Sequence, residues 1–365
     1  MNSEKINQLT NWLNDQNLSG AIITNYHSVA YLSGFESDPI ERVLALVLFA
    51  DHEPFLFGPA LEVNSMKESG WQYAAFGYED QENPWSKLAT HIQAATHGTF
   101  FAIEADNLTV ARLNLLQAAF PAAQFITDVT DQINKLRLIK TPAEIEHMKA
   151  AGRDADRAFE IGFQALKEGV SELAVAAELE YQLKKSGVVG MSFETLVQFG
   201  DHAADPHGST SSRTLNPGEM ALFDLGTMTE GYASDATRTV AFGPVSDEAK
   251  RIHAVTLEAQ LAAQSQAKIG MTASELDAVA RDIITKAGYG EYFNHRLGHG
   301  LGSSVHEFPS IMAGNDMTLE EGMVFSIEPG IYVPGVAGVR IEDSGYMSRD
   351  GFVPYTHTSK ELLQF

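Results

Sequence analysis

The first part of the chain alternates short apolar runs with polar turns. Residues 20–24, 43–49, 54–57 and 99–103 are predicted strands, because each run is short and rich in β-branched or aromatic residues. The polar residues 51–53 separate two of these runs and predict a hairpin. Helical spacing is expected at residues 27–32 and 113–120. This mixture predicts a sheet with helices on its faces.

A helix start marks the beginning of a second domain. Thr141 and Glu144 form a capping box with Pro142 at the first helical position, which predicts a helix reaching about Lys167, before Gly169. Further strands are expected at residues 220–225, 233–242, 323–327 and 339–347. We therefore predict two domains, residues 1–135 and residues 136–365.

The second domain repeats its own pattern weakly, at an offset of about a hundred residues. The segments that begin at Ser171 and Ser274 each read as a capped amphipathic helix that ends near a glycine. Downstream, the acids fall in matching places. The corresponding pairs are Asp224 with Glu328 and Asp235 with Glu342. Two halves packed about a pseudo-two-fold axis would bring these four acids to one centre.

The four acids and His299, which lies between two glycines, form a candidate metal site. Carboxylates packed together repel one another unless a cation lies between them. Oxygen ligands with one imidazole suit Mn, Co, Fe or Zn held as a pair, and not a structural zinc. Two such ions can share one hydroxide that attacks an amide. A single acid in a turn is usually only solvated, but two matched pairs with a histidine favour a metal-dependent hydrolase.

Composition narrows the class of protein. The chain has 365 residues, 44% of them hydrophobic, which is typical of a globular protein with sizeable cores. The absence of cysteine excludes a disulfide scaffold. A net charge of −23 argues against nucleic acids and anionic membranes as partners. With no membrane-length apolar run and no signal-peptide pattern, we expect a cytoplasmic protein.

Taken together, these segments resemble the pita-bread metallopeptidases, which include prolidases, aminopeptidase P and methionine aminopeptidase. The stretches GYASDATRTVA and HRLGHGLGSSVHEFPS carry the resemblance, which extends over the whole chain and is strongest to the short bacterial prolidases. It implies an α/β (α+β) fold. A creatinase-like N-terminal domain, with dimer contacts, would precede a pita-bread catalytic domain built from duplicated, pseudo-two-fold halves. The family is commonly homodimeric.

The resemblance also implies two divalent metal ions per subunit, Mn²⁺ first, with Co²⁺ or Zn²⁺ as alternatives. Asp235 and Glu342 would bridge the ions, Asp224 would complete one side, and His299 and Glu328 the other. Glu328 would also act as the general base.

Further residues are assigned from their place in the motifs. His306 is expected to stabilise the transition state by a hydrogen bond. Arg340 is expected on the strand face of Glu342, where it would pair with an acidic ligand or with a substrate carboxylate. Supporting positions are expected at Thr237 and Tyr332. Candidate substrate-binding residues are His207, His295, Arg296, Arg340, Tyr332 and Asp38, the last in a possible active-site lid at residues 35–42.

The function implied is hydrolysis of the X-Pro bond in dipeptides by a metal-bridging hydroxide. An alternative is aminopeptidase P type removal of one residue from longer X-Pro peptides. A remote alternative is a non-catalytic binding protein on the same scaffold, which the complete ligand set disfavours. Two departures from the family pattern lie beside the inferred pocket and bear on substrate range: Ser303-Ser304 and Gly200-Asp201-His202. The expected partners are small peptides.

Overall fold

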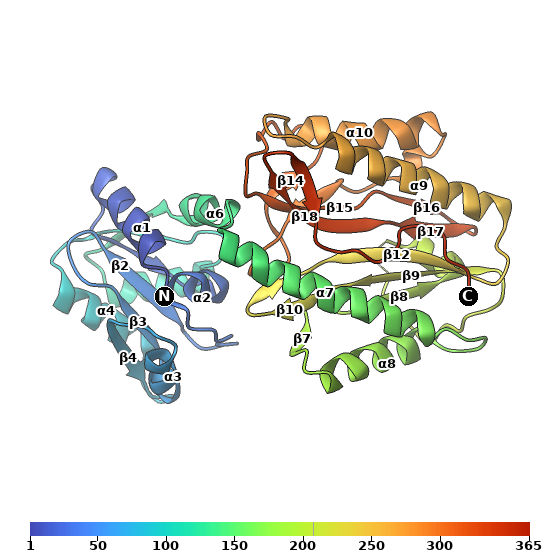
Figure 1. Cartoon of the computed structure of the whole chain (residues 1–365). Helices are drawn as coiled ribbons and strands as arrows, with labels where there is room; N and C mark the ends of the chain where they lie inside the picture. Colours follow the sequence, from blue (N-terminus) through green and yellow to red (C-terminus); the bar gives the residue numbers. More distant parts are fainter. Residues whose placement is uncertain (207) are drawn as a thin grey trace. The chain divides into compact units, whose positions relative to one another are not determined.

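A computed structural model describes residues 1–206 and 208–365, which form two compact units, Met1–Leu136 and Arg137–Phe365 (Figure 1). The first unit contains one mixed sheet of strand order β4-β3-β2-β1-β5-β6. Its strands are β1 (Gly20–Ile23), β2 (Ala45–Phe49), β3 (Phe55–Pro59), β4 (Ala74–Tyr78), β5 (Phe100–Ile103) and β6 (Gln124–Asp128). Its helices are α1 (Ser3–Asp15), α2 (Tyr26–Ser33), α3 (Val63–Glu68), α4 (Pro84–Ala95), α5 (Val110–Ala119) and most of α6 (Thr130–Leu138).

Alternate residues of the central strands enter two different hydrophobic cores. In β2, Val47 packs with α4 and α5, whereas Leu46 packs with α1 and α2. This period of two covers both faces of the sheet with helices, as expected from the sequence. The predicted hairpin is confirmed, because β2 and β3 pair antiparallel with Leu46 opposite Leu56.

The second unit is built on a larger sheet of order β14-β13-β15-β18-β12-β9-β8, with β19 paired to β18. Its strands are β8 (Leu196–Phe199), β9 (Glu219–Leu225), β12 (Ala236–Phe242), β13 (Gly298–Gly300), β14 (Glu307–Ile311), β15 (Val324–Ile327), β18 (Glu342–Ser348) and β19 (Gly351–Pro354). Smaller sheets contain β7 (Gly190–Met191), β10 (Thr227–Thr229), β11 (Tyr232–Ala233), β16 (Gly330–Val333) and β17 (Ala337–Arg340). Short 3₁₀ turns are η1 (Ala60–Glu62), η2 (Gly200–Ala204) and η3 (Gly290–Tyr292).

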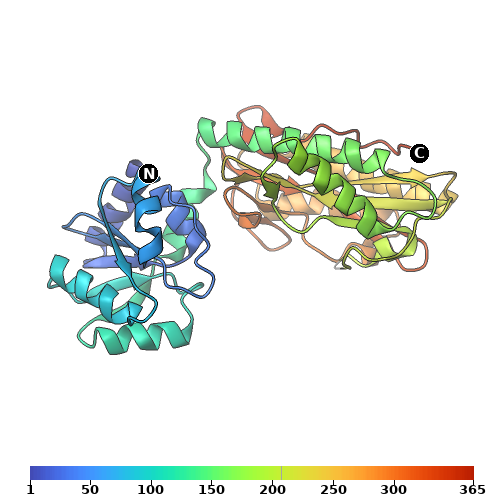
Figure 2. The ribbon, with the colours of Figure 1, turned by 90° about the horizontal axis from the view of Figure 1, so that it is seen from below.

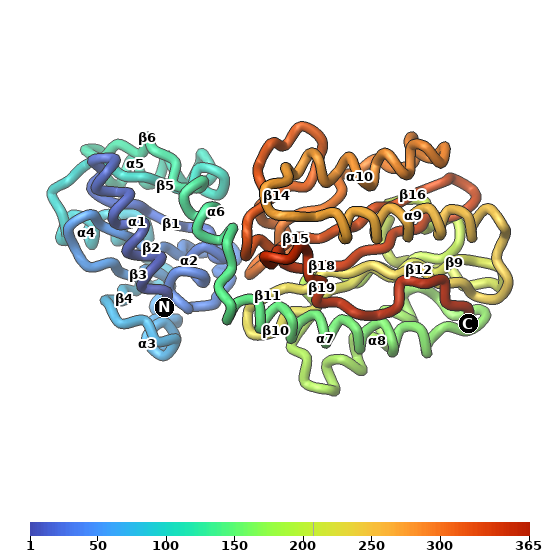
Figure 3. Tube along the Cα trace, turned by 45° about the horizontal axis from the view of Figure 1, so that its top comes forward, coloured from blue at the N-terminus to red at the C-terminus, as the bar shows by residue number. Residues whose placement is uncertain are grey.

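Two pairs of helices cover this sheet. The pair α7 (Pro142–Gln164) and α8 (Glu172–Lys185) lies side by side in Figure 2 and packs on β8, β9 and β12. The pair α9 (Asp247–Gln266) and α10 (Ala273–Lys286) packs with β15 and β18 (Figure 3). One half of the unit contributes β8, β9 and β12 to the sheet, the other half contributes β13, β14, β15, β18 and β19, and each half adds two helices. The halves meet where β12 pairs with β18. The predicted mixed α/β fold with duplicated halves is confirmed.

The seam between the halves is short. The β12–β18 register joins Ala236 to Asp343 and Thr237 to Glu342, whereas the β12–β9 register runs through seven pairs, from Ala236 to Phe242. The side chains at the seam alternate. Arg238 faces the ring of Phe159 in α7, and Thr237 turns to the opposite face. That opposite face carries the site described below.

Several helices begin at residues whose side chains cap the first turn. Thr141 and Glu144 make both hydrogen bonds of the predicted capping box, so that prediction is confirmed. Ser171 caps α8, but the corresponding cap of α10 is Thr272, two residues before the expected Ser274. The helix that begins after Thr141 ends at Gln164, slightly short of the expected end. Among the described residues, no helix combines the length and apolarity that a membrane span needs.

Two predicted strands are interrupted. The run 233–242 divides into β11 and β12, with Ser234 and Asp235 between them. The run 339–347 divides at Ile341 into β17, which pairs with β16, and β18, which enters the large sheet. Both predictions of one continuous strand were wrong, because the residue pattern continues across each break while the backbone changes its partner strand.

Buried His253 in α9 leads to a prediction about acid stability. It is 2% exposed, and burial lowers its pKa from 6.5 to about 4. Between these two pKa values the unfolded chain binds a proton at His253 and the folded chain does not. The free energy of unfolding should therefore fall as pH drops from about 6.5 to about 4. The whole effect is of the order of 3 kcal/mol. Urea unfolding of wild type and His253→Gln across this range should give a flatter pH dependence for the variant; equal slopes would contradict the assignment.

Candidate metal centre and active site

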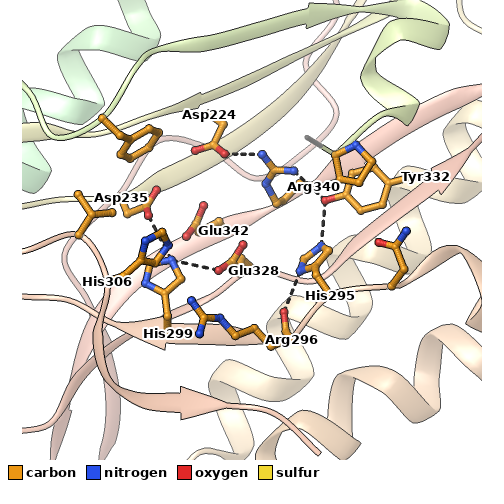
Figure 4. Close-up of a pocket in the computed structure, with 14 residues that line it drawn as sticks. Asp224, Asp235, His295, Arg296, His299, His306, Glu328, Tyr332, Arg340 and Glu342 are labelled. Atoms are coloured by element: carbon orange, nitrogen blue, oxygen red, sulfur yellow. Dashed lines mark hydrogen bonds and ion pairs between the residues drawn. The ribbon is translucent and has the colours of Figure 1, made fainter. Parts of the chain in front are cut away.

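The five predicted ligands come from the central strands of the second unit. Asp224 lies in β9 opposite Thr237, and Asp235 immediately precedes β12. His299 is the middle residue of β13, Glu328 directly follows β15, and Glu342 opens β18. Alternation along β9 places Phe223 in the core beneath α7, so its neighbour Asp224 points to the other face. All five side chains line one cavity of about 600 Å³ (Figure 4).

The ligand atoms lie close together. His299 Nε2 is 3.4 Å from Asp235 Oδ2 and 3.3 Å from Glu328 Oε1. Asp235, His299 and Glu342 each offer a ligand atom, and these atoms all lie within 4.8 Å of one another. The three residues are buried. Such a spacing of oxygen and imidazole donors is suited to a divalent cation.

The charges of this cluster also fit a cation. Burial raises the pKa of Asp235 well above its ordinary value, and the carboxylates of Asp224 and Glu328 raise it further. Burial and the same repulsion, led by Asp235, raise the pKa of Glu342. Asp224 Oδ1 and Glu342 Oε1 are buried and have no hydrogen-bond partner among the described residues. A buried carboxylate oxygen without a partner is costly, and a bound cation would remove that cost.

Arg340 connects two of the ligands. Its Nη2 donates to Asp224 Oδ2, its Nη1 donates to the Tyr332 hydroxyl at 2.7 Å, and its Nε donates to Thr237 Oγ1 at 3.1 Å. Thr237 Oγ1 in turn donates to Glu342 Oε2 at 2.7 Å. Of the two partners considered from the sequence, the structure pairs Arg340 with the acidic ligand. Arg340 lies in β17 and Glu342 in β18, but both side chains line the cavity.

His295 is held in one tautomer by its neighbours. Its Nδ1 lies 2.8 Å from the carbonyl oxygen of Arg296, so Nδ1 carries the hydrogen and donates. Its Nε2 lies 2.9 Å from the Tyr332 hydroxyl and accepts from it. Burial lowers the pKa of His295, which keeps the ring neutral. Burial also raises the pKa of Tyr332 to about 12, so its hydroxyl stays protonated.

Two further lining residues are not fully buried: His306 is exposed and Arg296 is half-buried. The ring of His306 is 4.2 Å from that of His299, centroid to centroid, at 67°. Partial burial, with His299 and Arg296 nearby, lowers the pKa of His306 to about 4, so the ring is neutral. Arg296 Nη1 donates to Ser310 Oγ at 3.1 Å, and the rest of its guanidinium makes no further hydrogen bond to the described residues.

The described lining of the cavity does not include two other predicted residues, His207 and Asp38. His207 lies outside the described residues. Asp38 belongs to the first unit, is exposed, and accepts a hydrogen bond from the Ile40 amide at 2.9 Å. Its role in substrate binding stays a prediction.

The structure adds lining residues that the sequence reasoning missed, namely Phe193, Pro206, Asn294 and Val305. Three of them directly adjoin a predicted histidine in the sequence, and this adjacency was the available signal. Phe193 had no such signal.

The two departures noted in the sequence do not line the described cavity. Ser303 and Ser304 instead accept hydrogen bonds from Arg137, and His202 contacts the buried carboxylate of Glu172 through its Nδ1. Neither departure therefore belongs to the described lining, so any effect on substrate range would be indirect.

Comparison with known proteins gives a consistent result. Residues 146–349 match the model of metallopeptidase family M24, and residues 5–139 match the creatinase/prolidase N-terminal domain. The chain is 53% identical over 364 residues to a Xaa-Pro dipeptidase of Lactobacillus helveticus, covering 99% of this chain and 98% of that one. It is 54% identical over 359 residues to a Xaa-Pro dipeptidase of Lactobacillus delbrueckii subsp. lactis, covering 98% of each chain.

Among solved structures, the Xaa-Pro dipeptidase from Bacillus anthracis aligns with a TM-score of 0.92 at 35% identity, covering 100% of this chain and 99% of that one. The cluster of carboxylates around His299 lies within the segment that the metallopeptidase model matches. The chain therefore belongs to metallopeptidase family M24 and carries a creatinase/prolidase N-terminal domain.

Proposed function

We propose that this protein is a Xaa-Pro dipeptidase that hydrolyses the X-Pro bond of dipeptides with the help of divalent metal ions. The observation that carries the proposal is the cavity in which four carboxylates and one imidazole converge. The names of the full-length relatives agree with it. A non-catalytic role on the same scaffold would not require this mutually repelling set of buried and half-buried acids.

The proposed metal complement is two ions, with Mn²⁺ as the first candidate. Asp235 and Glu342 would lie between them, Asp224 would hold one, and His299 and Glu328 the other. Bound divalent cations supply an activated water and a polarised carbonyl. Arg340 and Thr237 would keep Asp224 and Glu342 in place through the hydrogen bonds described above.

Glu328 is the proposed general base. Its Oε1 accepts a hydrogen bond from Ser326 Oγ at 3.1 Å, and its side chain reaches into the cavity. A carboxylate held in this way can take the proton of the attacking water. His306, neutral near pH 7, can donate an N–H hydrogen bond to the oxygen that becomes negative in the transition state.

The cavity wall suggests how proline is recognised. Phe193, Pro206 and Val305 contribute apolar surface that suits a pyrrolidine ring. Arg296 provides a cation for the free carboxylate of a dipeptide. The X-Pro bond has no N–H, so recognition through the strand-like hydrogen bonds used by most proteases is not possible.

Paired substrates test this proposal against the aminopeptidase P alternative. We expect Ala-Pro to be cleaved with a kcat/KM at least about tenfold above that of Ala-Pro-Ala, because each 1.4 kcal/mol of lost carboxylate binding is a tenfold effect. The measurement is product analysis for both substrates, with apo-protein reloaded with Mn²⁺, Co²⁺ or Zn²⁺. Equal or greater cleavage of the tripeptide would favour the alternative.

The lid hypothesis is tested in the same assay. Deletion of residues 36–41 should change the ratio of kcat/KM for Ala-Pro to kcat/KM for Ala-Pro-Ala, because the loop is proposed to limit substrate length. Unchanged kinetics on both substrates would contradict the lid hypothesis.

We also propose a cytoplasmic homodimer, on the basis of the family resemblance and the composition. Sedimentation equilibrium tests the dimer.

A further inference from the structure

A buried ion cluster surrounds the residue next to His306. The carboxylate of Glu307 lies between two cations: Arg137 Nη2 is 2.5 Å from Oε1, and Lys140 Nζ is 3.1 Å from Oε2. The side chains of Arg137, Lys140 and Glu307 are 9%, 2% and 5% exposed. None of the three lines the described cavity, and the proposed chemistry does not use them.

The same carboxylate organises the loop that leads to His306. Glu307 Oε1 accepts a hydrogen bond from the Ser304 amide at 3.0 Å. Arg137 Nη2 also donates to Ser304 Oγ at 2.7 Å and to Ser303 Oγ at 3.1 Å. A Cβ at Gly302 would lie 2.7 Å from Glu307 Oε2, so the carboxylate packs directly against this glycine. The Ser303-Ser304 pair, which departs from the family pattern, thus has a physical role as an acceptor for Arg137.

The cations are themselves fixed. The Lys140 amide donates to the Gly322 carbonyl at 2.9 Å, and Ile139 forms a bridge with Met323, next to β15. Burial alone would raise the pKa of Glu307, but Lys140 and Arg137 hold that pKa below its ordinary value, so the cluster is charged. A buried ion cluster gains little net stability over an apolar one, but it fixes geometry.

His306 depends on its backbone for orientation. Among the described residues, no side chain is hydrogen-bonded to its ring, which is in contact with the ring of His299. The position of the His306 ring is therefore set by the loop from Gly302 to Glu307. We propose that Glu307, held by Arg137 and Lys140, is a positioning residue that fixes His306 at the active-site cavity.

This inference rests on the proposed function of His306, and a double-mutant cycle separates the two. Glu307→Gln keeps the size of the side chain and removes its charge. We expect it to lower kcat by about tenfold, as loss of an outer support does. KM for Ala-Pro and metal content should change little. In a His306→Ala background, the same substitution should change kcat by less than about twofold, because the group it positions is gone.

A second variant guards against misfolding of the first. Arg137→Lys keeps the charge but loses the planar fork that reaches Ser303, Ser304 and Glu307 together. It should show the same pattern, with a smaller loss of kcat. Glu321→Gln is the matched control, because it breaks an exposed ion pair with Arg349 and should leave kcat unchanged.

The outcomes are distinct. The inference is supported if Glu307→Gln lowers kcat in the otherwise wild-type enzyme but not in the His306→Ala background. An equal loss in both backgrounds would overturn it, since Glu307 would then act without His306. Unchanged kcat in both Glu307→Gln and Arg137→Lys would overturn it as well. Full activity of His306→Ala alone would instead overturn the proposed role of His306, and with it the reason for positioning that ring.

Discussion

Asp235→Asn and Glu342→Gln should each lower kcat/KM by at least about 10²-fold, because each removes a charge from between the proposed metal ions. Both substitutions are nearly isosteric, and both side chains are buried. In each case an amide replaces a carboxylate whose pKa is raised in the metal-free protein. Burial and the neighbouring acids disfavour the charge at both positions, so the loss should appear in metal binding and in turnover.

Metal content by elemental analysis and kcat/KM for Ala-Pro should be measured on the same preparations. Wild type and the Glu321→Gln control should bind equal amounts of manganese, whereas the two ligand variants should bind less. Near-full activity in both ligand variants would contradict the metal assignment. Reduced activity with unchanged metal content would instead place these two acids outside the ligand set.

The second large effect is expected for His306→Ala, which should lower kcat by roughly 10²-fold and leave the metal content unchanged. Removal of one donor to a developing oxyanion has this size in other hydrolases. The ring lies beside His299 but makes no hydrogen bond to the acids among the described residues, so its loss should leave the ligand cluster intact.

A graded series sharpens this test. His306→Gln keeps a neutral N–H donor and should recover part of the loss, whereas a purely steric role would leave both variants alike. KM for the dipeptide should change less than kcat, because the hydrogen bond is made mainly in the transition state. Loss of metal in His306→Ala would reassign the residue to the ligands.

Much of the site could be predicted because each ligand stands in a short, recognisable motif. Asp224, Asp235, Glu328 and Glu342 stand in matching places of two halves, and four acids brought to one centre require an explanation in terms of charge. The central strands of both units are apolar enough to be recognised. The edge strands β4 and β6 were missed, because most of their residues are partly or fully exposed and interrupt the apolar pattern. Helix α9 was also missed, since Ile252 is the one large aliphatic residue among the seven buried residues of this helix, and the others are alanine or polar.

The rest depends on contacts between distant segments. Period-two alternation placed Arg340 on a face, but it could not choose between a ligand and a substrate as partner. Arg137 meets Ser304 and Glu307 across more than 160 residues of sequence. Neither residue type nor spacing marks such a contact beforehand. The strand breaks at Asp235 and Ile341 belong to the same class, because they are set by which neighbouring strand offers hydrogen bonds.

The short seam between β12 and β18 has a consequence beyond chemistry. Asp235 directly precedes the first of the two residue pairs that join the halves, Glu342 belongs to the second pair, and the two acids come from opposite sides of that seam. A cation shared between them would act as a cross-link between the duplicated halves. Metal binding should therefore raise the free energy of unfolding of the catalytic unit. A chain stripped of its ions should be cleaved more easily by proteases, in addition to being inactive.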